Sequence, residues 1–144
     1  MTKSPDAILA LDVGAKRIGV AVASLIARLP RPLITLENNE TFMPALTDII
    51  EVEGIGAIVV GFPRGLQGQQ TAQTKEIEDF TQQLREQFAM PIRFQDESVT
   101  SKKAEAELRA RGGQYERGDI DALAATYILE DFLRDPKNLV ELEV

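Results

Sequence analysis

Apolar residues follow two patterns along the chain, and the change from one to the other predicts the order of the elements. Residues 8–13 and 17–23 are apolar at nearly every position, as in strands that are covered on both faces. Shorter apolar stretches between proline or glycine predict further strands. The predicted strands are 8–13, 17–23, 33–36, 57–60 and 91–95. Gly61-Phe62-Pro63 is expected to end the fourth in a turn, because a central strand rarely carries proline.

Elsewhere apolar residues recur every three or four positions, which is the spacing of one helical stripe. Ile77, Phe80, Leu84 and Phe88 form such a stripe. Asp119 is expected to cap the last helix, which runs to Arg134. The predicted helices are 41–52, a helix that carries the stripe from Ile77 to Phe88, a helix from Ser98 or Thr100 to Arg111, and 119–134.

The resulting order, β-β-β-α-β-α-β-α-α, predicts an α/β fold in which a mixed five-stranded sheet carries helices on both faces. We expect one domain, residues 7–135, followed by a C-terminal tail, residues 136–144. No apolar run approaches the roughly 20 residues that cross a bilayer, and the first residues lack the apolar stretch of a secretory signal. The expected location is the cytoplasm, with no membrane partner.

Two residue types, histidine and cysteine, are absent from the sequence. Their absence excludes disulfides, thiolate nucleophiles, Ser-His-Asp triads and the usual zinc sites. Carboxylate chemistry remains, and oxygen ligands suit hard cations such as magnesium and manganese. The net charge of −7 counts against a protein that grips nucleic acid by bulk electrostatics, although bound metal and a local basic patch would offset it.

Asp12 lies within the most hydrophobic predicted strand. Burying an unpaired ionised carboxylate there would cost on the order of several kcal/mol, so something must compensate the charge. Asp12 either accepts backbone N–H bonds from Gly14 or Ala15 in the following turn, or binds a cation. Taken alone, an aspartate this close to glycine favours the turn-capping interpretation.

Three further acidic residues lie at the ends of predicted elements. Asp96 and Glu97 end a strand, where open α/β sheets place ligands, and alternation sends their side chains to opposite faces. Only one of the pair can therefore share a site with Asp12. Asp121 lies near the start of the last helix, where interaction with the helix dipole is the simpler explanation. These carboxylates form a metal site only if the fold brings them together.

Four segments resemble the motifs of one known family. They are Leu11 to Ala21 (LDVGAKRIGVA), Val60-Gly61-Phe62-Pro63 followed by Gly68, Asp96-Glu97 followed by Thr100-Ser101 and Ala104, and Ile120-Asp121 before Ala124-Ala125. The first of these is the most specific. Together they make nearly the whole chain, from Ile8 to about Leu133, similar to the YqgF/RuvX family, which is described both as Holliday-junction resolvases and as pre-16S rRNA nucleases.

This resemblance implies a ribonuclease H-like fold and a metal-dependent endonuclease, a hydrolase that cuts phosphodiester bonds. It implies that Asp12, Glu97 and Asp121 are the catalytic residues and hold the metal, with two magnesium or manganese ions as cofactors. Three residues are expected to support this site: Asp96, Gly14 and Thr100.

One position departs from the family pattern. Family members commonly have arginine directly after the acidic pair, whereas this chain has Ser98. A planar cation suited to substrate phosphate is missing there. Lys16 and Arg17 lie beside Asp12, where they either bind substrate or are simply solvated. The candidate substrate-binding residues are Lys16, Arg17, Arg64, Arg93 and Lys102.

The expected partner is nucleic acid, and the expected reaction is processing of the 5′ end of pre-16S rRNA. A branched DNA junction is the first alternative, and it would favour a homodimer because a two-fold symmetric junction requires two active sites. A second alternative is a non-catalytic protein that binds nucleic acid, which Ser98 and the acidic charge keep open. A third is an actin-like nucleotide-binding module, but such modules require a second domain of comparable size.

Overall fold

The computed structural model of the chain describes residues 6–63, 71–97 and 100–142, without the side chains of residues 97 and 100–102. Its centre is a five-stranded sheet in the order β3-β2-β1-β4-β5. β1 (Ala7–Val13) is antiparallel to β2 and parallel to β4, and β5 is parallel to β4. The other strands are β2 (Arg17–Ser24), β3 (Arg31–Glu37), β4 (Ile55–Pro63) and β5 (Ile92–Glu97). The predicted mixed sheet is confirmed.

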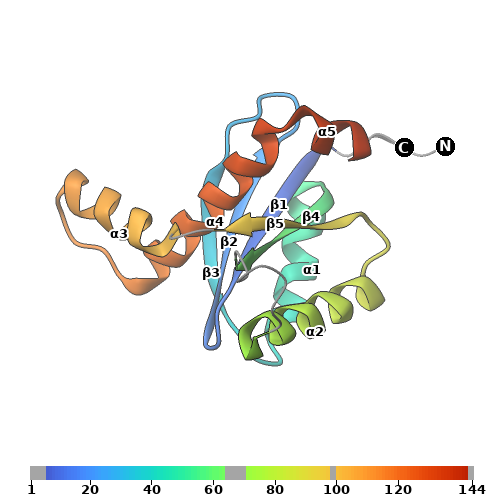
Figure 1. The fold of residues 1–144 in the computed structure, drawn as a ribbon, viewed down its shortest axis with the longest axis horizontal. Coiled ribbons are helices and arrows are strands. Elements are labelled where there is room, and N and C mark those ends of the chain that lie inside the picture. The colour runs from blue at the N-terminus through green and yellow to red at the C-terminus, as the bar shows by residue number, and fades with distance from the viewer. Residues whose placement is uncertain (1–5, 64–70, 98–99, 143–144) are drawn as a thin grey trace.

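Helices cover both faces of this sheet, as predicted (Figure 1). α1 and α2 lie on one face and α4 crosses the other, while α3 projects beyond the sheet and packs against α4. The described helices are α1 (Phe42–Glu53), α2 (Ala72–Gln87), α3 (Thr100–Arg111), α4 (Arg117–Arg134) and α5 (Pro136–Leu142).

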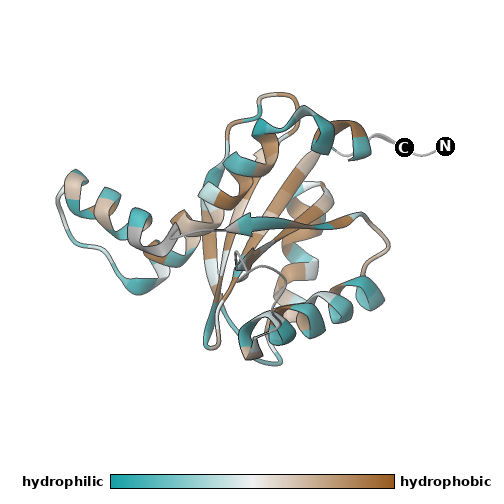
Figure 2. Ribbon diagram, in the orientation of Figure 1, coloured by the Kyte–Doolittle hydropathy of each residue, from teal (hydrophilic) through white to brown (hydrophobic). Residues whose placement is uncertain are grey.

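The two faces of the sheet are lined by side chains of different size. Large side chains fill the face towards α1 and α2, among them Leu9, Leu11, Ile18, Val20, Phe42 and Leu46. Alanine predominates among the strand residues that face α4, which include Ala10, Ala21, Ala23 and Ala57. Hydrophobic residues are concentrated on the central strands (Figure 2). Because interiors are closely packed, small side chains on one face allow a helix to approach that face more closely.

The prediction for the end of β4 is wrong. The strand continues through Gly61 and Phe62 to Pro63 instead of ending in a turn. The register between β1 and β4 ends at Val60, whereas the register with β5 extends to Pro63 and Glu97. Proline is tolerated there because the end of β4 pairs with β5 rather than with strands on both sides.

The predicted start of the last helix is also wrong. α4 begins at Arg117, and Glu116 rather than Asp119 is its N-cap residue. The carboxylate of Asp119 accepts the backbone N–H of Glu116 at 2.9 Å, which is one half of a capping box. Asp119 therefore stabilises the helix start from the third helical position.

The last described residues form α5, and Leu142 is buried in the hydrophobic cluster beneath α4. The division of the chain into a domain, 7–135, and a tail, 136–144, stays a prediction. Among the described residues, every helix is too short or too polar to cross a membrane.

Candidate active site

The carboxyl ends of β1, β4 and β5 meet at one edge of the sheet, because these three strands are parallel. Asp12 is the last residue but one of β1, Pro63 ends β4 and Glu97 ends β5. Pro63 and Glu97 are partners in the register of β4 and β5. Open α/β sheets bind ligands at such an edge. The fold therefore brings Asp12 and the backbone of Glu97 to the same edge, with one strand between them.

Asp12 belongs to a row of three residues that crosses the sheet on its α4 face. Gly19 is the register partner of both Asp12 and Thr35. The hydroxyl of Thr35 donates to the carbonyl oxygen of Gly118 in α4 at 2.5 Å, so this row faces α4. Ala10, two residues before Asp12, lies in the cluster beneath the same helix. Strand alternation then places Asp12 on the α4 face as well.

Gly19 allows α4 to contact β2 directly through its backbone. A Cβ atom at this position would lie 2.0 Å from the carbonyl oxygen of Asp121 and 2.9 Å from the backbone nitrogen of Ala122. Any side chain would force the helix away, so the contact requires glycine. Asp12 and Asp121 consequently adjoin the same glycine, one from the neighbouring strand and one from the helix above it.

The side chain of Asp121 forms an ion pair with Arg17, the first residue of β2. The guanidinium Nε donates to Oδ2 of Asp121 at 2.6 Å, and the two side chains are 36% and 19% exposed. Because α4 begins at Arg117, Asp121 lies beyond the first turn, where the helix dipole acts only weakly. The positive charge of Arg17 therefore compensates the charge of this carboxylate.

The turn between β1 and β2 is fixed by hydrogen bonds to its backbone. The N–H of Gly14 donates to the carbonyl of Arg17 at 2.9 Å, and the side-chain amide of Asn38 donates to the carbonyl of Gly14 at 2.8 Å. The Gly14 N–H is thus engaged within the turn, which removes one of the two donors on which the turn-capping interpretation of Asp12 depends.

Asp96 lies on the face opposite to this site. Phe94, two residues earlier in β5, packs under the guanidinium of Arg85 in α2, with 5.5 Å between Cζ and the ring centroid. Alternation gives Asp96 the same face as Phe94, away from Asp12 and Asp121. Asp96 is also exposed. Its expected supporting role, like those of Gly14 and Thr100, stays a prediction.

The described residues next to Gly19 include two carboxylates that could bind a metal, Asp12 and Asp121. Among the residues within 6–63, 71–97 and 100–142 that are fully described, no three acidic side chains form a group that could hold a metal. The side chain of Glu97, the third expected ligand, lies outside that description. Oxygen donors are the ligands that magnesium and manganese prefer, and the chain has no histidine or cysteine to favour a softer metal. The donor chemistry therefore fits a hard divalent cation.

The basic residues expected to bind substrate have different surroundings. Lys16 is exposed in the turn, whereas the Nε of Arg17 is bound to Asp121. Arg93 is half-buried, and its guanidinium donates to the carbonyl of the preceding residue at 3.4 Å. Outside the description lie Arg64, Ser98 and the side chain of Lys102. Their part in substrate binding stays a prediction.

Sequence reasoning missed two residues that position this site, Gly19 and Thr35. A glycine inside an apolar strand is a signal of close backbone approach and could have indicated the contact with α4. Thr35 gives no such signal, because its partner Gly118 is 83 residues away. The pairing of Arg17 with Asp121 spans 104 residues and was equally hidden.

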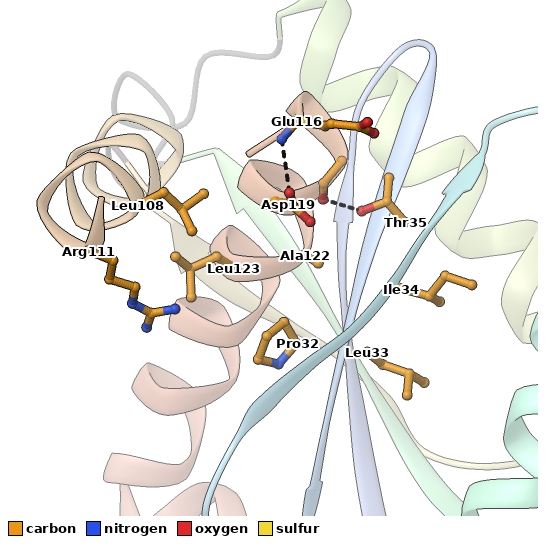
Figure 3. A pocket seen from close by; sticks show the side chains of 11 residues that line it. Pro32, Leu33, Ile34, Thr35, Leu108, Arg111, Glu116, Asp119, Ala122 and Leu123 are labelled. Atoms are coloured by element: carbon orange, nitrogen blue, oxygen red, sulfur yellow. Dashed lines mark hydrogen bonds between the residues drawn. The ribbon is translucent and has the colours of Figure 1, made fainter. Parts of the chain in front are cut away.

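A separate hollow of about 490 Å³ lies between β3, α3 and the start of α4 (Figure 3). Its lining is largely apolar, and the carboxylate of Asp119 beside it is bonded to the backbone of Glu116. The described lining includes neither Asp12 nor Asp121. This hollow is therefore distinct from the carboxylate site.

Comparison with known families shows which family the chain belongs to. The model of the RuvX family, described as Holliday junction resolvase, matches residues 6–135. The chain belongs to the RuvX family. Two relatives, both named "Putative pre-16S rRNA nuclease", come from Nitratidesulfovibrio vulgaris (strain DP4) and Picosynechococcus sp. (strain ATCC 27264 / PCC 7002 / PR-6). They are 35% and 38% identical to this chain, over 90% of it in each case and over 94% and 92% of their own lengths.

Solved structures with a similar fold confirm the architecture expected for the RuvX family. Thermus thermophilus RuvC in complex with a Holliday junction substrate has a TM-score of 0.53 and 13% identity, covering 85% of this chain and 90% of RuvC. The Fowlpox virus resolvase in complex with Holliday junction DNA has a TM-score of 0.50 and 11% identity, covering 96% and 99%. At these identities the likeness establishes the fold alone, which is ribonuclease H-like.

Proposed function

We propose that this RuvX-family chain is a metal-dependent endonuclease that hydrolyses phosphodiester bonds in processing the 5′ end of pre-16S rRNA. One observation carries the proposal: Asp12 and Asp121 adjoin the same glycine at the carboxyl edge of the sheet. The residues that make this contact are far apart in sequence, and the names of the relatives supply the substrate. Such processing places the protein in the cytoplasm.

In this proposal Asp12, Asp121 and Glu97 are the catalytic residues and would hold two magnesium or manganese ions. Bound ions of this kind lower the pKa of the attacking water and stabilise the negative charge of the departing oxygen. The chain itself supplies the position of the carboxylates. Asp12 is fixed by the pairing of β1 with β2, and Asp121 by the contact of α4 with Gly19.

The strand between Asp12 and Glu97 supports the choice of these two residues. Gly61 in β4 follows Ala57 and Val59, which face α4, at the same alternation. Gly61 has no side chain, so none projects from β4 at this level on the α4 face. In β5 the register partner of Gly61 is Gln95 and that of Pro63 is Glu97, so Glu97 lies two residues beyond the level of Gly61. Carboxylates from β1 and β5 would converge on the metal from either side of β4.

Substrate phosphate requires cations near these carboxylates, and the chain offers few. Lys16 is exposed in the turn that follows Asp12, which places a mobile charge beside the site. Arg64 and Lys102 follow the ends of β4 and β5 in sequence and are proposed to act with it. Binding through phosphates alone would make the affinity fall steeply with salt.

A second candidate is cleavage of branched DNA, which the description of the RuvX family favours. Paired cuts in a symmetric junction require two active sites, so this activity calls for a homodimer. The two substrates therefore predict different assemblies.

Cleavage of labelled precursor rRNA and labelled junction DNA, compared side by side with manganese and with excess chelator, tests the proposal. We expect cleavage of the rRNA near its mature 5′ end, dependent on manganese and abolished in Asp12→Asn. Asp48→Asn, an exposed aspartate on α1, is the matched control and should cleave like wild type. Activity that persists in chelator would contradict the metal mechanism. Cleavage of the junction DNA without cleavage of the rRNA would favour the second candidate function over the first.

A further inference from the structure

Arg17 occupies an unusual position for a residue expected to bind substrate. Its Nε donates to Oδ2 of Asp121 at 2.6 Å, so one of the carboxylates of the candidate site already has a positive partner. Lys16, the neighbouring basic residue, is exposed and lies outside this contact. Of these two adjacent basic residues, only Arg17 is paired with a described carboxylate of the candidate site.

The backbones of both residues in this ion pair are held in place. Its backbone carbonyl accepts the N–H of Gly14 at 2.9 Å, which closes the turn, and its backbone belongs to the first pair of β2 with β3, opposite Glu37. The other end of the ion pair is equally fixed, because the backbone of Asp121 lies against Gly19. The fold therefore fixes the distance between the two backbones, so that forming the ion pair orders only the two side chains.

The guanidinium group and a divalent ion are both positive and would both bind the carboxylate of Asp121. Resting on the proposed function, we propose that Arg17 is an internal counter-ion: it holds Asp121 in the metal-free protein and competes with the divalent metal for that carboxylate.

The competition has two opposite consequences. Without metal, Arg17 offsets the repulsion between carboxylates that are brought together around Gly19. With metal, the same charge weakens binding, which keeps the affinity lower than the carboxylates alone would give. Arg17 thus lowers the metal affinity of the site and stabilises the metal-free site.

Binding of Mn²⁺ to the full chain, measured by calorimetry or by the EPR signal of free Mn²⁺, tests this inference with Arg17→Gln. The variant should bind Mn²⁺ roughly tenfold more tightly, since a hydrogen bond to a charged group contributes about the free energy of one decade in affinity. Its melting temperature without metal should fall. Added Mn²⁺ should then raise that temperature by more than it does in wild type.

Two further variants make the result specific. Lys16→Gln removes the same charge from the adjacent, exposed position and should change the affinity by less than about twofold, because solvent screens its charge. Arg17→Lys keeps the charge and should return the affinity towards that of wild type. Arg17→Lys also serves if Arg17→Gln fails to fold. Because lysine cannot reproduce the Nε contact, the Arg17→Lys protein should still bind Mn²⁺ more tightly than wild type.

The failures of the inference and of the proposed function differ. Unchanged Mn²⁺ affinity in the Arg17 variants would show that the ion pair only anchors α4. Weaker Mn²⁺ affinity would show that Arg17 orients Asp121 for the metal. Either result overturns the inference but leaves the proposed nuclease function standing. Absence of Mn²⁺ binding in wild type and all variants would overturn both. Equal tightening in Lys16→Gln and Arg17→Gln would also contradict the inference, because it would reflect net charge alone.

Discussion

The two faces of the sheet solve different packing problems. Towards α1 and α2, large side chains such as Leu11, Phe42 and Leu46 fill the space between sheet and helices. Towards α4, alanine and glycine leave so little space that the backbone of Asp121 touches Gly19. The first face buries apolar area and stabilises the fold. The second positions Asp121, a candidate functional residue, by a direct backbone contact between α4 and β2.

This difference explains where the carboxylate site lies. A helix held away by leucine and phenylalanine would keep the short side chain of an aspartate away from the sheet. At Gly19 the helix backbone itself reaches the strand next to Asp12. Thr35 adds a second anchor by donating to Gly118 in the first turn of α4. The small-residue face therefore carries the candidate site, and changes there should affect metal binding more than changes on the other face.

The largest effect is expected from Gly19→Ala. The added Cβ would lie 2.0 Å from a backbone oxygen, so α4 must move, and we expect a loss of stability of about 3 kcal/mol or more together with the loss of the Mn²⁺ response. Thermal melting with and without Mn²⁺ measures both effects.

Gly118→Ala is the matched control for Gly19→Ala. A Cβ there would lie 3.5 Å from Thr35, an ordinary contact, and alanine is the better helix former. Stability should be unchanged or higher by up to about 1 kcal/mol. A Gly19→Ala protein that melts like wild type would refute the close contact between α4 and β2.

On the opposite face, Leu46→Ala should lower stability by about 2–5 kcal/mol through loss of buried area and the cavity left behind. Leu46 is fully buried between α1 and the sheet. Its loss should nevertheless leave the increase in melting temperature with Mn²⁺ intact, because the residue does not touch the α4 face. Denaturant unfolding gives the free energy, and a Mn²⁺ response lost together with stability would show that the two faces are not independent.

A smaller effect is expected from Tyr127→Phe, at the contact between α3 and α4. The hydroxyl of Tyr127 donates to Glu107 at 2.6 Å, and its removal should cost about 1 kcal/mol. Burial, followed by this hydrogen bond, raises the pKa of Tyr127. The stability from Tyr127 is therefore present below about pH 10 and is lost above it, where the tyrosine of the unfolded chain ionises first.

Melting temperatures between neutral and alkaline pH measure this effect. Wild type should lose more stability than Tyr127→Phe above about pH 10, so that the difference between them narrows. A constant difference across that range would contradict the raised pKa. The Mn²⁺ response should be the same in both proteins, since the pair lies on the far side of α4 from Gly19.

The sequence predicted the parts of the fold that depend on local pattern. The strongly apolar strands around Asp12 and the amphipathic helix through Leu84 were placed correctly. The end of β4 was not, because Pro63 extends a strand only through its pairing with β5, which no local pattern shows. Helix α5 was missed for the same reason, since its seven residues form a helix whose Leu142 packs into a distant cluster.

The residues of the candidate site could also be predicted from local pattern, whereas their contacts could not. Asp12 could be singled out because a charge within an apolar strand must be compensated, and Asp121 could be recognised by its family motif. Its ion pair with Arg17 could not be predicted, because it depends on how α4 crosses β2. Glycine at position 19 was the one local signal of that crossing.

The most direct test of the metal site is the change in melting temperature that Mn²⁺ produces in wild type and in Asp12→Asn. Asparagine keeps the shape of aspartate without its charge. If Asp12 is a metal ligand, the variant should be at least as stable as wild type without metal, because one of the mutually repelling carboxylates is gone, and it should lose the increase in melting temperature with Mn²⁺. A variant that melts lower without metal, by about 1 kcal/mol as for a lost capping residue, and keeps the full Mn²⁺ response would contradict the account.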